Sequence, residues 1–275
     1  MHAILSSKSL LFLPAHRLDR FKTAKASGAS VVCVDLQDGL PEAEKDRGRD
    51  AVKELFQHES DVLVALRINP PTSEHGIQDV KALRSCPNQP QAVILPTIEH
   101  AGDIAAAVAE LGDVLQGASL IVMIETVKAI CDIDSICAAC PHGAALLFGN
   151  ADMSSSMRCA NDWESLAYVR SRLIMFAAKW SLPAFDGVTI ELENEALLEE
   201  ECNKSRRLGF AGKAAVHPRQ IETINRNFSP TVEEVAEARS IVVAYEASSG
   251  GAIRVGNKMV DRPVYLAAVS LLKTH

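Results

Sequence analysis

Two carboxylates stand out because each follows a short, almost wholly apolar run of the sequence. Glu125 comes directly after residues 120–124, and Asp152 comes shortly after residues 144–149. A continuous apolar run of this length predicts a strand buried on both faces, as in a parallel sheet. The carboxyl ends of such strands hold the reacting groups of α/β enzymes. Two carboxylates there, from neighbouring strands, would form a hard-oxygen site suited to Mg²⁺.

Other polar residues follow two earlier apolar runs in the same way. Asp35 and Asp38 come at the end of one run, and Arg67 and Asn69 at the end of the next. In a functional interpretation, Arg67 holds an anionic substrate oxygen through bidentate contact. In a structural interpretation, Asp35 and Asp38 cap the following helix and Arg67 pairs with them. The residues alone leave both interpretations open.

The elements that must position these residues alternate between strand and helix. Strands are expected at Leu10–Leu13, Val31–Asp35, Val62–Arg67, Ala92–Leu95, Ser119–Ile124, Ala144–Phe148, Gly187–Ile190 and Gly212–Val216. Helices are expected at 17–27, 41–56, 76–84, 100–111, 127–139, about 161–180 and 193–207. Eight strands that alternate with helices in this way predict a (β/α)₈ barrel. A doubly wound open sheet is the alternative, although its dinucleotide-binding form would require a G-x-G-x-x-G motif after the first strand.

The last part of the chain has a different pattern and is expected to form a separate C-terminal segment, residues 229–275, after a barrel of residues 1–228. Thr231 is a candidate N-cap for a helix to about Ala247, because Glu234 follows three positions later. Residues 253–260 predict a hairpin, and residues 263–273 a final helix. Glycines flanking the hairpin suggest a lid or an arm onto another subunit.

Composition excludes several classes of function. The chain has 275 residues, 48% of them hydrophobic, and a net charge of −7. No basic run supports nucleic-acid binding. The N-terminus lacks the pattern of a signal peptide, and no apolar stretch approaches the roughly 20 residues that span a bilayer. Seven scattered cysteines argue against a disulfide framework and indicate a reducing, cytoplasmic location without a membrane partner.

Taken in order, several motifs resemble the citrate lyase beta-subunit-like family, relatives of the malyl-CoA and citramalyl-CoA lyases. They are residues 9–14 (SLLFLP), 34–39 (VDLQDG), 66–69 (LRIN), 124–130 (IETVKAI), 148–152 (FGNAD), 209–220 (GFAGKAAVHPRQ) and 260–263 (VDRP). Each motif alone is a weak signal. Together, at these separations, they cover nearly the whole chain.

The resemblance implies a (β/α)₈ barrel that uses Mg²⁺ and acts on acyl-CoA or acyl-carrier thioesters. It places the metal carboxylates on Glu125 and Asp152, and the substrate arginine on Arg67. In several relatives an aspartate of the C-terminal segment reaches a neighbouring subunit's site as an acid or base, and Asp261 matches that position. Relatives with this feature are usually trimers or hexamers, so a homotrimer or hexamer is expected.

The resemblance also implies a set of contacts with the thioester cofactor. These fall on Phe12, Lys213, Val216 and His217, with Arg17, Arg20 and Lys22 as looser candidates for contact with the cofactor's phosphates. For the three basic residues the alternative is a solvated helix face.

Two positions depart from the family pattern. Gln37 replaces the glutamate of the family's Asp-Leu-Glu-Asp motif, and this change removes one negative charge near the metal while Asp38 is kept. Such a change would weaken Mg²⁺ binding or shift the substrate preference. Ala15 replaces a glycine after the first strand and reduces backbone freedom there.

The expected function is a Mg²⁺-dependent carbon–carbon lyase that cleaves a 3-hydroxy-3-carboxyacyl-CoA by retro-Claisen chemistry. Citramalyl-CoA would give acetyl-CoA and pyruvate, and malyl-CoA would give acetyl-CoA and glyoxylate. The alternatives are a citryl-CoA or citryl-carrier lyase, a non-catalytic CoA-binding homologue, and a different Mg²⁺ enolate barrel such as a 2-oxoacid aldolase.

Overall fold

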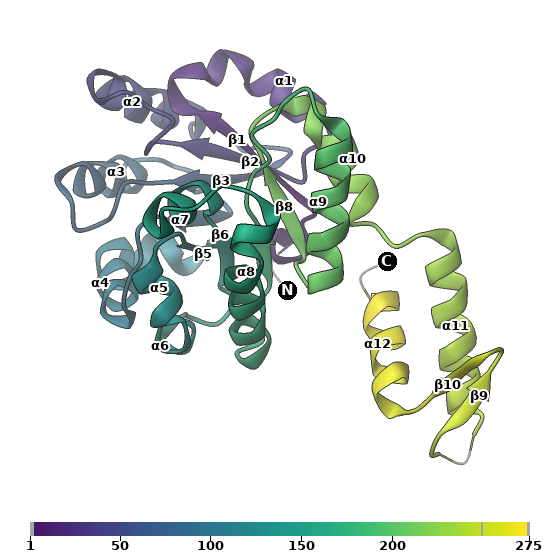
Figure 1. Ribbon diagram of the computed structural model, residues 1–275. Helices are drawn as coiled ribbons and strands as arrows, with labels where there is room; N and C mark the ends of the chain where they lie inside the picture. The colour runs from purple at the N-terminus through teal and green to yellow at the C-terminus, as the bar shows by residue number, and fades with distance from the viewer. Residues whose placement is uncertain (1–2, 249, 274–275) are drawn as a thin grey trace. The chain divides into compact units, whose positions relative to one another are not determined.

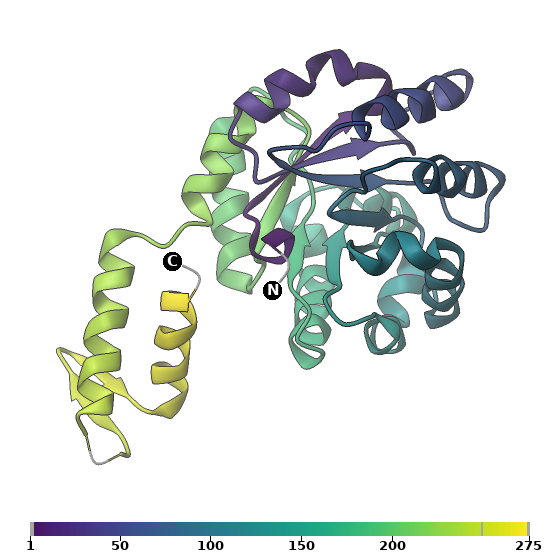
Figure 2. The ribbon, with the colours of Figure 1, turned by 180° about the vertical axis from the view of Figure 1, so that it is seen from behind.

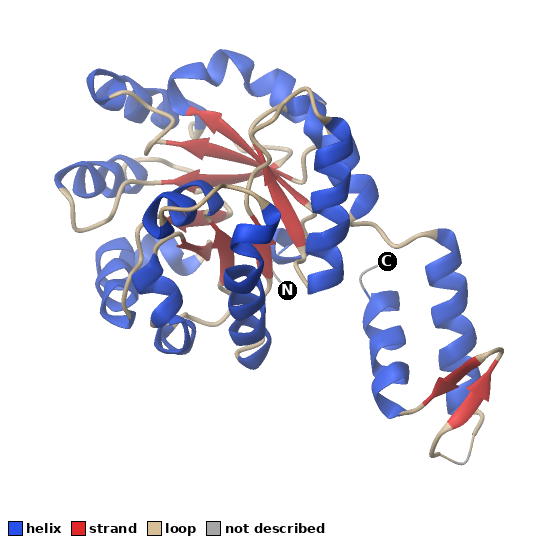
Figure 3. Cartoon of the chain, viewed as in Figure 1, coloured by secondary structure: helices blue, strands red, loops and turns tan. Residues whose placement is uncertain are grey.

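A computed structural model of the chain describes residues 3–248 and 250–273. Within these residues, eight parallel strands pair in the order β1 to β8 and close into a barrel that helices surround (Figures 1 and 3). The predicted (β/α)₈ barrel is therefore confirmed. The view from behind shows the same ring of helices outside the strands (Figure 2).

The bounds of the elements are as follows. The strands are β1 (Ser9–Pro14), β2 (Val31–Asp35), β3 (Leu63–Arg67), β4 (Ala92–Leu95), β5 (Ser119–Ile124), β6 (Ala145–Phe148), β7 (Ala184–Asp186), β8 (Gly212–Ala215), β9 (Ile253–Val255) and β10 (Lys258–Val260). The α-helices are α1 (Phe21–Ala26), α2 (Lys45–Leu55), α3 (Glu74–Arg84), α4 (Ala101–Leu111), α5 (Val127–Cys131), α6 (Ile133–Ala139), α7 (Asn150–Met157), α8 (Trp163–Lys179), α9 (Glu195–Leu208), α10 (Ile221–Asn227), α11 (Val232–Glu246) and α12 (Arg262–Lys273). Short 3₁₀ segments are η1 (Ala3–Ser6), η2 (Ala15–Arg20), η3 (Glu42–Glu44), η4 (Gly112–Gln116) and η5 (Pro218–Gln220).

The barrel lumen is filled by alternate residues of each strand. On β2, Val31 and Cys33 belong to the buried cluster inside the barrel. Because successive side chains of a strand point to opposite faces, Asp35 points the same way at the end of that strand. The parallel register pairs Asp35 with Arg67 on β3. The period of the strand and the register together bring these two charged residues to one level of the barrel.

The seventh strand is not where the sequence placed it. The predicted strand Gly187–Ile190 is wrong, because β7 ends at Asp186 and these four residues follow it as a loop. The β-branched Val188 and Thr189 suggested a strand, whereas a charged residue such as Asp186 argues against a buried one. That aspartate is tolerated because ion pairs surround it, and such pairs cannot be seen in a local sequence pattern.

Several helices also differ from their predicted bounds. The expected helix over 17–27 is a 3₁₀ segment, η2, followed by α1, and the expected helix over 127–139 is divided at Asp132 into α5 and α6. The sequence did not indicate α7 or α10. The omission of α7 matters most, because this helix carries Asp152 in its first turn.

A buried ion cluster joins the last two barrel strands to the helices outside them. Asp186 and Lys213 have no exposed side-chain surface and lie 3.1 Å apart. Arg170 on α8 donates to Asp186 at 2.9 Å, and Glu201 on α9 lies 3.4 Å from the Lys213 ammonium. Burial alone would raise the pKa of Asp186, but Lys213 and Arg170 together lower it to about 2. The carboxylate is therefore ionised at neutral pH.

The chain divides into two compact units, Met1–Arg226 and Asn227–His275. In the second unit α11 and α12 lie side by side and the predicted hairpin, β9 with β10, is present (Figures 1 and 2). A small core of Ala238, Ile241, Val260 and Ala268 holds it together. Thr231 caps α11 in a capping box with Glu234, as predicted. Use of this unit as a lid or subunit contact stays a prediction.

Within the described residues, no helix combines the length and the apolar character that crossing a membrane requires.

Replacement of Lys213 tests the buried ion cluster. Lys213→Met should lower the free energy of unfolding by about 3–5 kcal/mol, because it leaves Asp186 and Glu201 buried without their shared cation. Urea unfolding measures this change. Lys204→Met on α9 is the control, because Lys204 pairs with Glu164 and Glu200 at the surface and its loss should cost at most about 1 kcal/mol. Equal losses for the two variants would contradict the assignment.

Candidate active site

A cavity of about 350 Å³ opens at the carboxyl ends of the barrel strands. Its lining comes from β1, β2, β3, β5, β6, β7 and β8 or the residues that follow them. The lining residues are Phe12, Pro14, Asp35, Asp38, Gly39, Arg67, Met123, Leu147, Phe148, Gly149, Asn150, Ala151, Asp152, Gly187, Val188, Ala214 and Val216. The cavity thus gathers Arg67, Asp152, Asp35 and Asp38, as the sequence predicted. A larger groove between α1 and α2, of about 1010 Å³, has a mixture of acidic and basic residues and lies outside the barrel.

Glu125 lies beside this cavity in a buried position. It follows β5 in phase with Ile121 and Met123, which point into the lumen, so the strand period turns its carboxylate inward. Only 3% of the residue is exposed. Its Oε1 accepts hydrogen bonds from the Thr97 amide at 2.6 Å and the Thr97 hydroxyl at 3.3 Å. Its Oε2 is buried and has no hydrogen-bond partner among the described residues.

The backbone of Thr97 is strained where it meets Glu125. Thr97 has a φ of 55°, in the left-handed region that a β-branched residue rarely adopts. The amide of Thr97, in this conformation, donates to the Glu125 carboxylate. Strain of this kind persists only where the surrounding structure enforces it, and it clusters at functional sites. The strain therefore marks the β4 end as part of the site, although the sequence gave no signal for Thr97.

The surroundings of Glu125 raise the pKa of its carboxyl group. Burial raises the pKa of Glu125 most, and the nearby carboxylates of Asp152 and Asp38 raise it further. The Thr97 amide and the Arg67 guanidinium lower it but do not outweigh these effects. A buried carboxylate with one bare oxygen and a second carboxylate nearby is a site that a divalent cation would stabilise.

Arg67 is held by a bidentate ion pair with Asp35. Its Nε and Nη2 donate to the two carboxylate oxygens at 2.7 and 2.6 Å. The guanidinium lies over the Phe12 ring, 4.9 Å from its centroid. Its Nη1 lies 3.7 Å from Asp38 Oδ2 and 3.9 Å from Met123 Sδ. The pairing expected under the structural interpretation is therefore present, yet Arg67 also lines the cavity.

Gly149 and Asn150 build the part of the site that comes from β6. A Cβ atom at Gly149 would lie 2.5 Å from Glu125 Cβ and 2.9 Å from its Oε2, so only glycine fits there. Asn150 holds the loop after β7 in place, with its side chain accepting from the Val188 amide and donating to the Val188 carbonyl. α7 begins at this point and presents Asp152, which is exposed, in its first turn.

The donor set fits a magnesium ion. Glu125 offers a bare carboxylate oxygen, and Asp152 offers an exposed carboxylate on the wall of the same cavity. Mg²⁺ prefers oxygen ligands and usually takes one or two carboxylates, keeping other positions for water and substrate. No group of three or more His, Cys, Asp or Glu residues suited to a metal occurs in residues 3–248 and 250–273. Any metal here would therefore keep open positions.

A second cavity, of about 540 Å³, adjoins the first and shares Phe12, Pro14 and Val216 with it. Arg17, Arg20 and Arg219 line it together with two histidines, His16 and His217. None of the described residues that line this cavity is acidic. An anionic group extending from the first cavity would meet a cationic surface here.

Other predicted site residues lie elsewhere. Lys213 belongs to the fully buried ion cluster described above, so its side chain cannot reach a cofactor and we leave it out of the proposed thioester site. Gln37 does not line the first cavity, and its buried Oε1 has no hydrogen-bond partner in the part of the chain that the structure describes. Asn69 turns away from the cavity to Asp79. Asp261 lies in the second unit and its Oδ1 accepts from the Val264 amide at the start of α12.

Comparison with known proteins places the chain among related sequences and structures. The model of the HpcH/HpaI aldolase/citrate lyase family matches residues 8–218. A "citrate lyase subunit beta-like protein" of Mycobacterium tuberculosis is 31% identical over 269 residues, which is 96% of this chain and 93% of that protein.

Two solved structures are also similar. RipC from Yersinia pestis is 34% identical with a TM-score of 0.74, covering 84% of this chain and 99% of RipC. The CitE protein of M. tuberculosis, in complex with magnesium, acetoacetate and coenzyme A, is 26% identical with a TM-score of 0.82, covering 98% of each chain.

Replacement of Glu125 by glutamine tests the electrostatic description of the site. A raised folded-state pKa means that Glu125 supports folding fully below its unfolded pKa of about 4.3, and that this contribution is lost as pH rises through the folded value. With a chelator present, Glu125→Gln should therefore be more stable than the wild type above that pH, by on the order of 1 kcal/mol.

Thermal unfolding between about pH 5 and pH 8 measures the difference, which should grow with pH. Glu222→Gln, at an exposed position on α10, is the control and should follow the wild type at each pH. A Glu125→Gln curve parallel to that of the wild type would show that the carboxylate is not electrostatically strained.

Proposed function

The chain belongs to the HpcH/HpaI aldolase/citrate lyase family, and from this premise we propose that it is a Mg²⁺-dependent carbon–carbon lyase acting on an acyl-CoA thioester. The substrate would be a 3-hydroxy-3-carboxyacyl-CoA, cleaved to acetyl-CoA and a 2-oxoacid. Citramalyl-CoA and malyl-CoA are the two substrates that we favour.

One observation carries the proposal: the bare Oε2 of Glu125 lies next to Gly149 on the cavity wall, and the same cavity is lined by Asp152 and Arg67. These groups provide two carboxylates for a hard cation and one guanidinium for an oxyanion. The similar CitE structure holds magnesium, acetoacetate and coenzyme A together, which supports the same ligand classes here.

When it is held by Glu125 and Asp152, Mg²⁺ would supply Lewis-acid polarisation of the substrate oxygens. Arg67 would orient the substrate's carboxylate and balance the negative charge that develops during cleavage. Asp35 takes two of the N–H groups of Arg67 and so fixes the direction of the guanidinium. The Phe12 ring lies against the guanidinium, 4.9 Å from its centre, and would help to orient it.

The lining of the first cavity favours a small 2-oxoacid product. Arg67 is the cation among the described residues that line this cavity, and Asp35 already pairs with it. The remaining wall is largely apolar, with Met123, Leu147 and Val188. The methyl group of pyruvate or the hydrogen of glyoxylate suits such a wall. The second carboxylate of oxaloacetate, the product of citryl-CoA cleavage, would lie without a partner at a cost of several kcal/mol.

The second cavity suits the CoA part of the substrate. We propose that Arg17 and Arg20 bind its phosphates, because an arginine fork matches phosphate geometry. Phe12, Val216 and His217 would line the path from the thioester to these arginines, since they border this cavity.

Asp261 is proposed to exchange the proton at the acetyl carbon. It lies in the C-terminal unit, at the start of α12, and is partly exposed. We propose that it acts in the site of a neighbouring subunit of a homotrimer or hexamer. Glu125 and Asp152 would be occupied with the metal and Asp35 with Arg67, so a separate acid would be required at the carbon atom.

The change at Gln37 favours a second candidate function, that of a non-catalytic CoA-binding protein. The buried Oε1 of Gln37 lacks a hydrogen-bond partner within residues 3–248 and 250–273, so this position is not optimised in the absence of ligands. In that case CoA would bind without any cleavage.

A cleavage assay decides between the two functions. Purified protein should release a 2-oxoacid and acetyl-CoA from citramalyl-CoA or malyl-CoA with Mg²⁺, at least about tenfold faster than from citryl-CoA. A chelator should abolish the reaction. CoA binding without cleavage of any of the three thioesters would support the non-catalytic alternative and contradict the lyase.

The same assay tests the role of Arg67. Arg67→Ala should reduce turnover by roughly two to three orders of magnitude, as does loss of a group that stabilises developing charge, while circular dichroism stays that of the folded protein. Arg47→Ala is the control, because Arg47 is exposed on α2 and pairs with Glu44. Near-native turnover of Arg67→Ala would refute the assignment.

Mixing two variants tests whether Asp261 acts between subunits. Arg67→Ala and Asp261→Asn should each be inactive alone. When subunits are exchanged at a 1:1 ratio, an intact barrel meets an intact Asp261 in about a quarter of the sites, if the subunits mix at random. Activity should therefore recover to up to about a quarter of the wild-type rate. If exchange is demonstrated by mass spectrometry and no activity returns, Asp261 does not act across subunits.

A further inference from the structure

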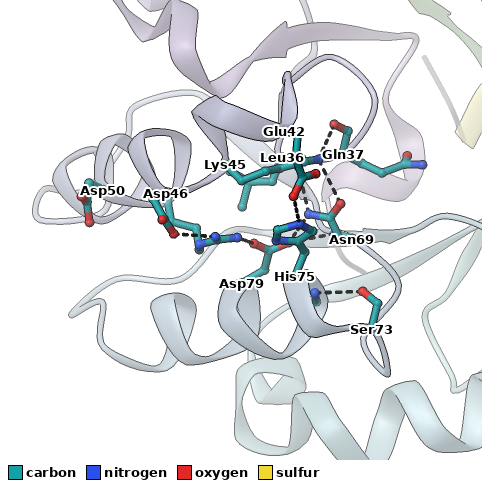
Figure 4. A network of polar contacts seen from close by, with 12 residues as sticks. Leu36, Gln37, Glu42, Lys45, Asp46, Asp50, Asn69, Ser73, His75 and Asp79 are labelled. Carbon is teal, nitrogen blue, oxygen red and sulfur yellow. Dashed lines mark hydrogen bonds and ion pairs between the residues drawn. The ribbon is translucent and has the colours of Figure 1, made fainter.

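The turn that follows β2, residues 35–39, carries two charged groups of the cavity and is held from its outer side by a buried lysine. Lys45, at the start of α2, is 8% exposed. Its ammonium donates to the carbonyl oxygens of Leu36 and Gln37, at 2.8 and 2.7 Å, and to Asn69 Oδ1 at 3.1 Å. Figure 4 shows these three contacts converging on the ammonium group. All three of its protons are thereby used on neutral oxygens.

The inner side of the same turn is held by Asp35. The amide of Gln37 donates to Asp35 Oδ1 and the amide of Gly39 to Oδ2, both at 2.9 Å. The turn therefore presents carbonyl groups outward to the lysine and amides inward to the aspartate. The same two oxygens also accept hydrogen bonds from Arg67, so the amides help to hold the carboxylate facing the guanidinium. A Cβ atom at Gly39 would lie 2.5 Å from Asp35 Oδ2, so the approach is close.

A second row of residues holds Lys45 itself in place. Asn69 donates through Nδ2 to the Leu36 carbonyl and to Asp79 Oδ2, and its amide donates to the same Asp79 oxygen. Asp79, which is fully buried, also accepts from Arg49 at 3.0 Å. Figure 4 shows this row running between α2 and α3. The network lies outside the barrel, so none of these groups touches the cavity.

A buried ammonium is costly unless its position is required. Within residues 3–248 and 250–273, Lys45 has no ion pair with a carboxylate; its hydrogen bonds go to amide oxygens. A side chain that served only to fill space would be apolar, since burial of a charge without a counter-charge is unfavourable. The ammonium instead binds the carbonyl groups of Leu36 and Gln37 in the turn, where the Leu40 amide also donates to the Gln37 carbonyl at 3.1 Å.

We propose that Lys45 is a positioning residue of the active site: through the carbonyl groups of Leu36 and Gln37 it holds the turn that directs Asp35 onto Arg67. This inference rests on the proposed binding of a 2-oxoacid at Arg67. Loss of Lys45 would let the turn relax, free the two amides from Asp35 and loosen the guanidinium. Removal of such an outer contact typically costs about 10–100-fold in affinity or activity.

The experiment uses the full-length protein and two measurements. Isothermal titration with pyruvate, at saturating Mg²⁺, gives both the number of sites and the dissociation constant. Lys45→Met should raise the dissociation constant at least about tenfold while the number of sites stays that of the wild type. Hydrogen exchange of the peptide that contains residues 35–40 should become faster, because the amides of Gln37 and Gly39 would lose their hydrogen bonds to the Asp35 carboxylate.

Lys53→Met is the matched control. It changes the same residue type on the same helix, but Lys53 makes a surface pair with Asp50. It should leave both measurements unchanged. If Lys45→Met does not fold, Asn69→Ala replaces it, because that variant keeps the ammonium but removes one of its acceptors and the contact with the Leu36 carbonyl; a smaller rise, about three- to tenfold, is expected.

The outcomes separate the positioning role from general stabilisation. A lower number of sites with an unchanged dissociation constant would mean that Lys45 only supports folding, and would overturn the inference. Unchanged exchange over residues 35–40 would overturn it as well. If the wild type binds no pyruvate, the proposed function fails, and the exchange measurement still decides whether Lys45 holds the turn.

Discussion

The bidentate pair between Asp35 and Arg67 is the interaction on which the arrangement of the site depends. The two residues end adjacent strands in register, so the pair forms at the barrel mouth as soon as β2 and β3 are aligned. It neutralises a guanidinium that is mostly buried, and it orients that guanidinium on the Phe12 ring. The amides of Gln37 and Gly39 keep the aspartate where two hydrogen bonds to arginine are possible.

The site contains a charge that the protein alone does not satisfy. Glu125 is buried, has one bare oxygen, and lies near other carboxylates that raise its pKa. The strained backbone of Thr97 helps to hold it. Functional sites commonly keep such unfavourable features because a ligand relieves them. Elsewhere in the same barrel, buried charges are paired with opposite charges, as in the cluster around Asp186 and Lys213.

Buried charged groups therefore differ between two parts of the barrel, the ion cluster that faces the helices and the cavity at the strand ends. Toward the helices, Asp186 is paired with Lys213 and Arg170, which lower its pKa to about 2. At the first cavity, Glu125 Oε2 has no hydrogen-bond partner among the described residues, and Asp152 lines the same cavity. The neighbouring cavity is lined by arginines and by no acidic residue among those described, although Arg17 and Arg219 also pair with Asp19 and Glu193. Two carboxylates beside a cationic surface correspond to the two ends of the proposed ligands: a divalent cation with a 2-oxoacid, and a phosphate-bearing thioester.

The sequence by itself determined the barrel and the residues at its mouth, because both depend on local patterns. Apolar runs marked strands such as β2, β4 and β5 at their observed bounds, and the residues that follow them include Asp35 and Glu125. What the sequence could not indicate depends on contacts between distant segments. β7 was misplaced because its aspartate is tolerated only beside Lys213 and Arg170. The burial of Glu125 against Thr97 and the contacts of Lys45 with the turn exist only once the barrel has closed. Each of them joins different strands or the helices outside them. Tertiary structure decided which charges are satisfied and which remain available to a ligand.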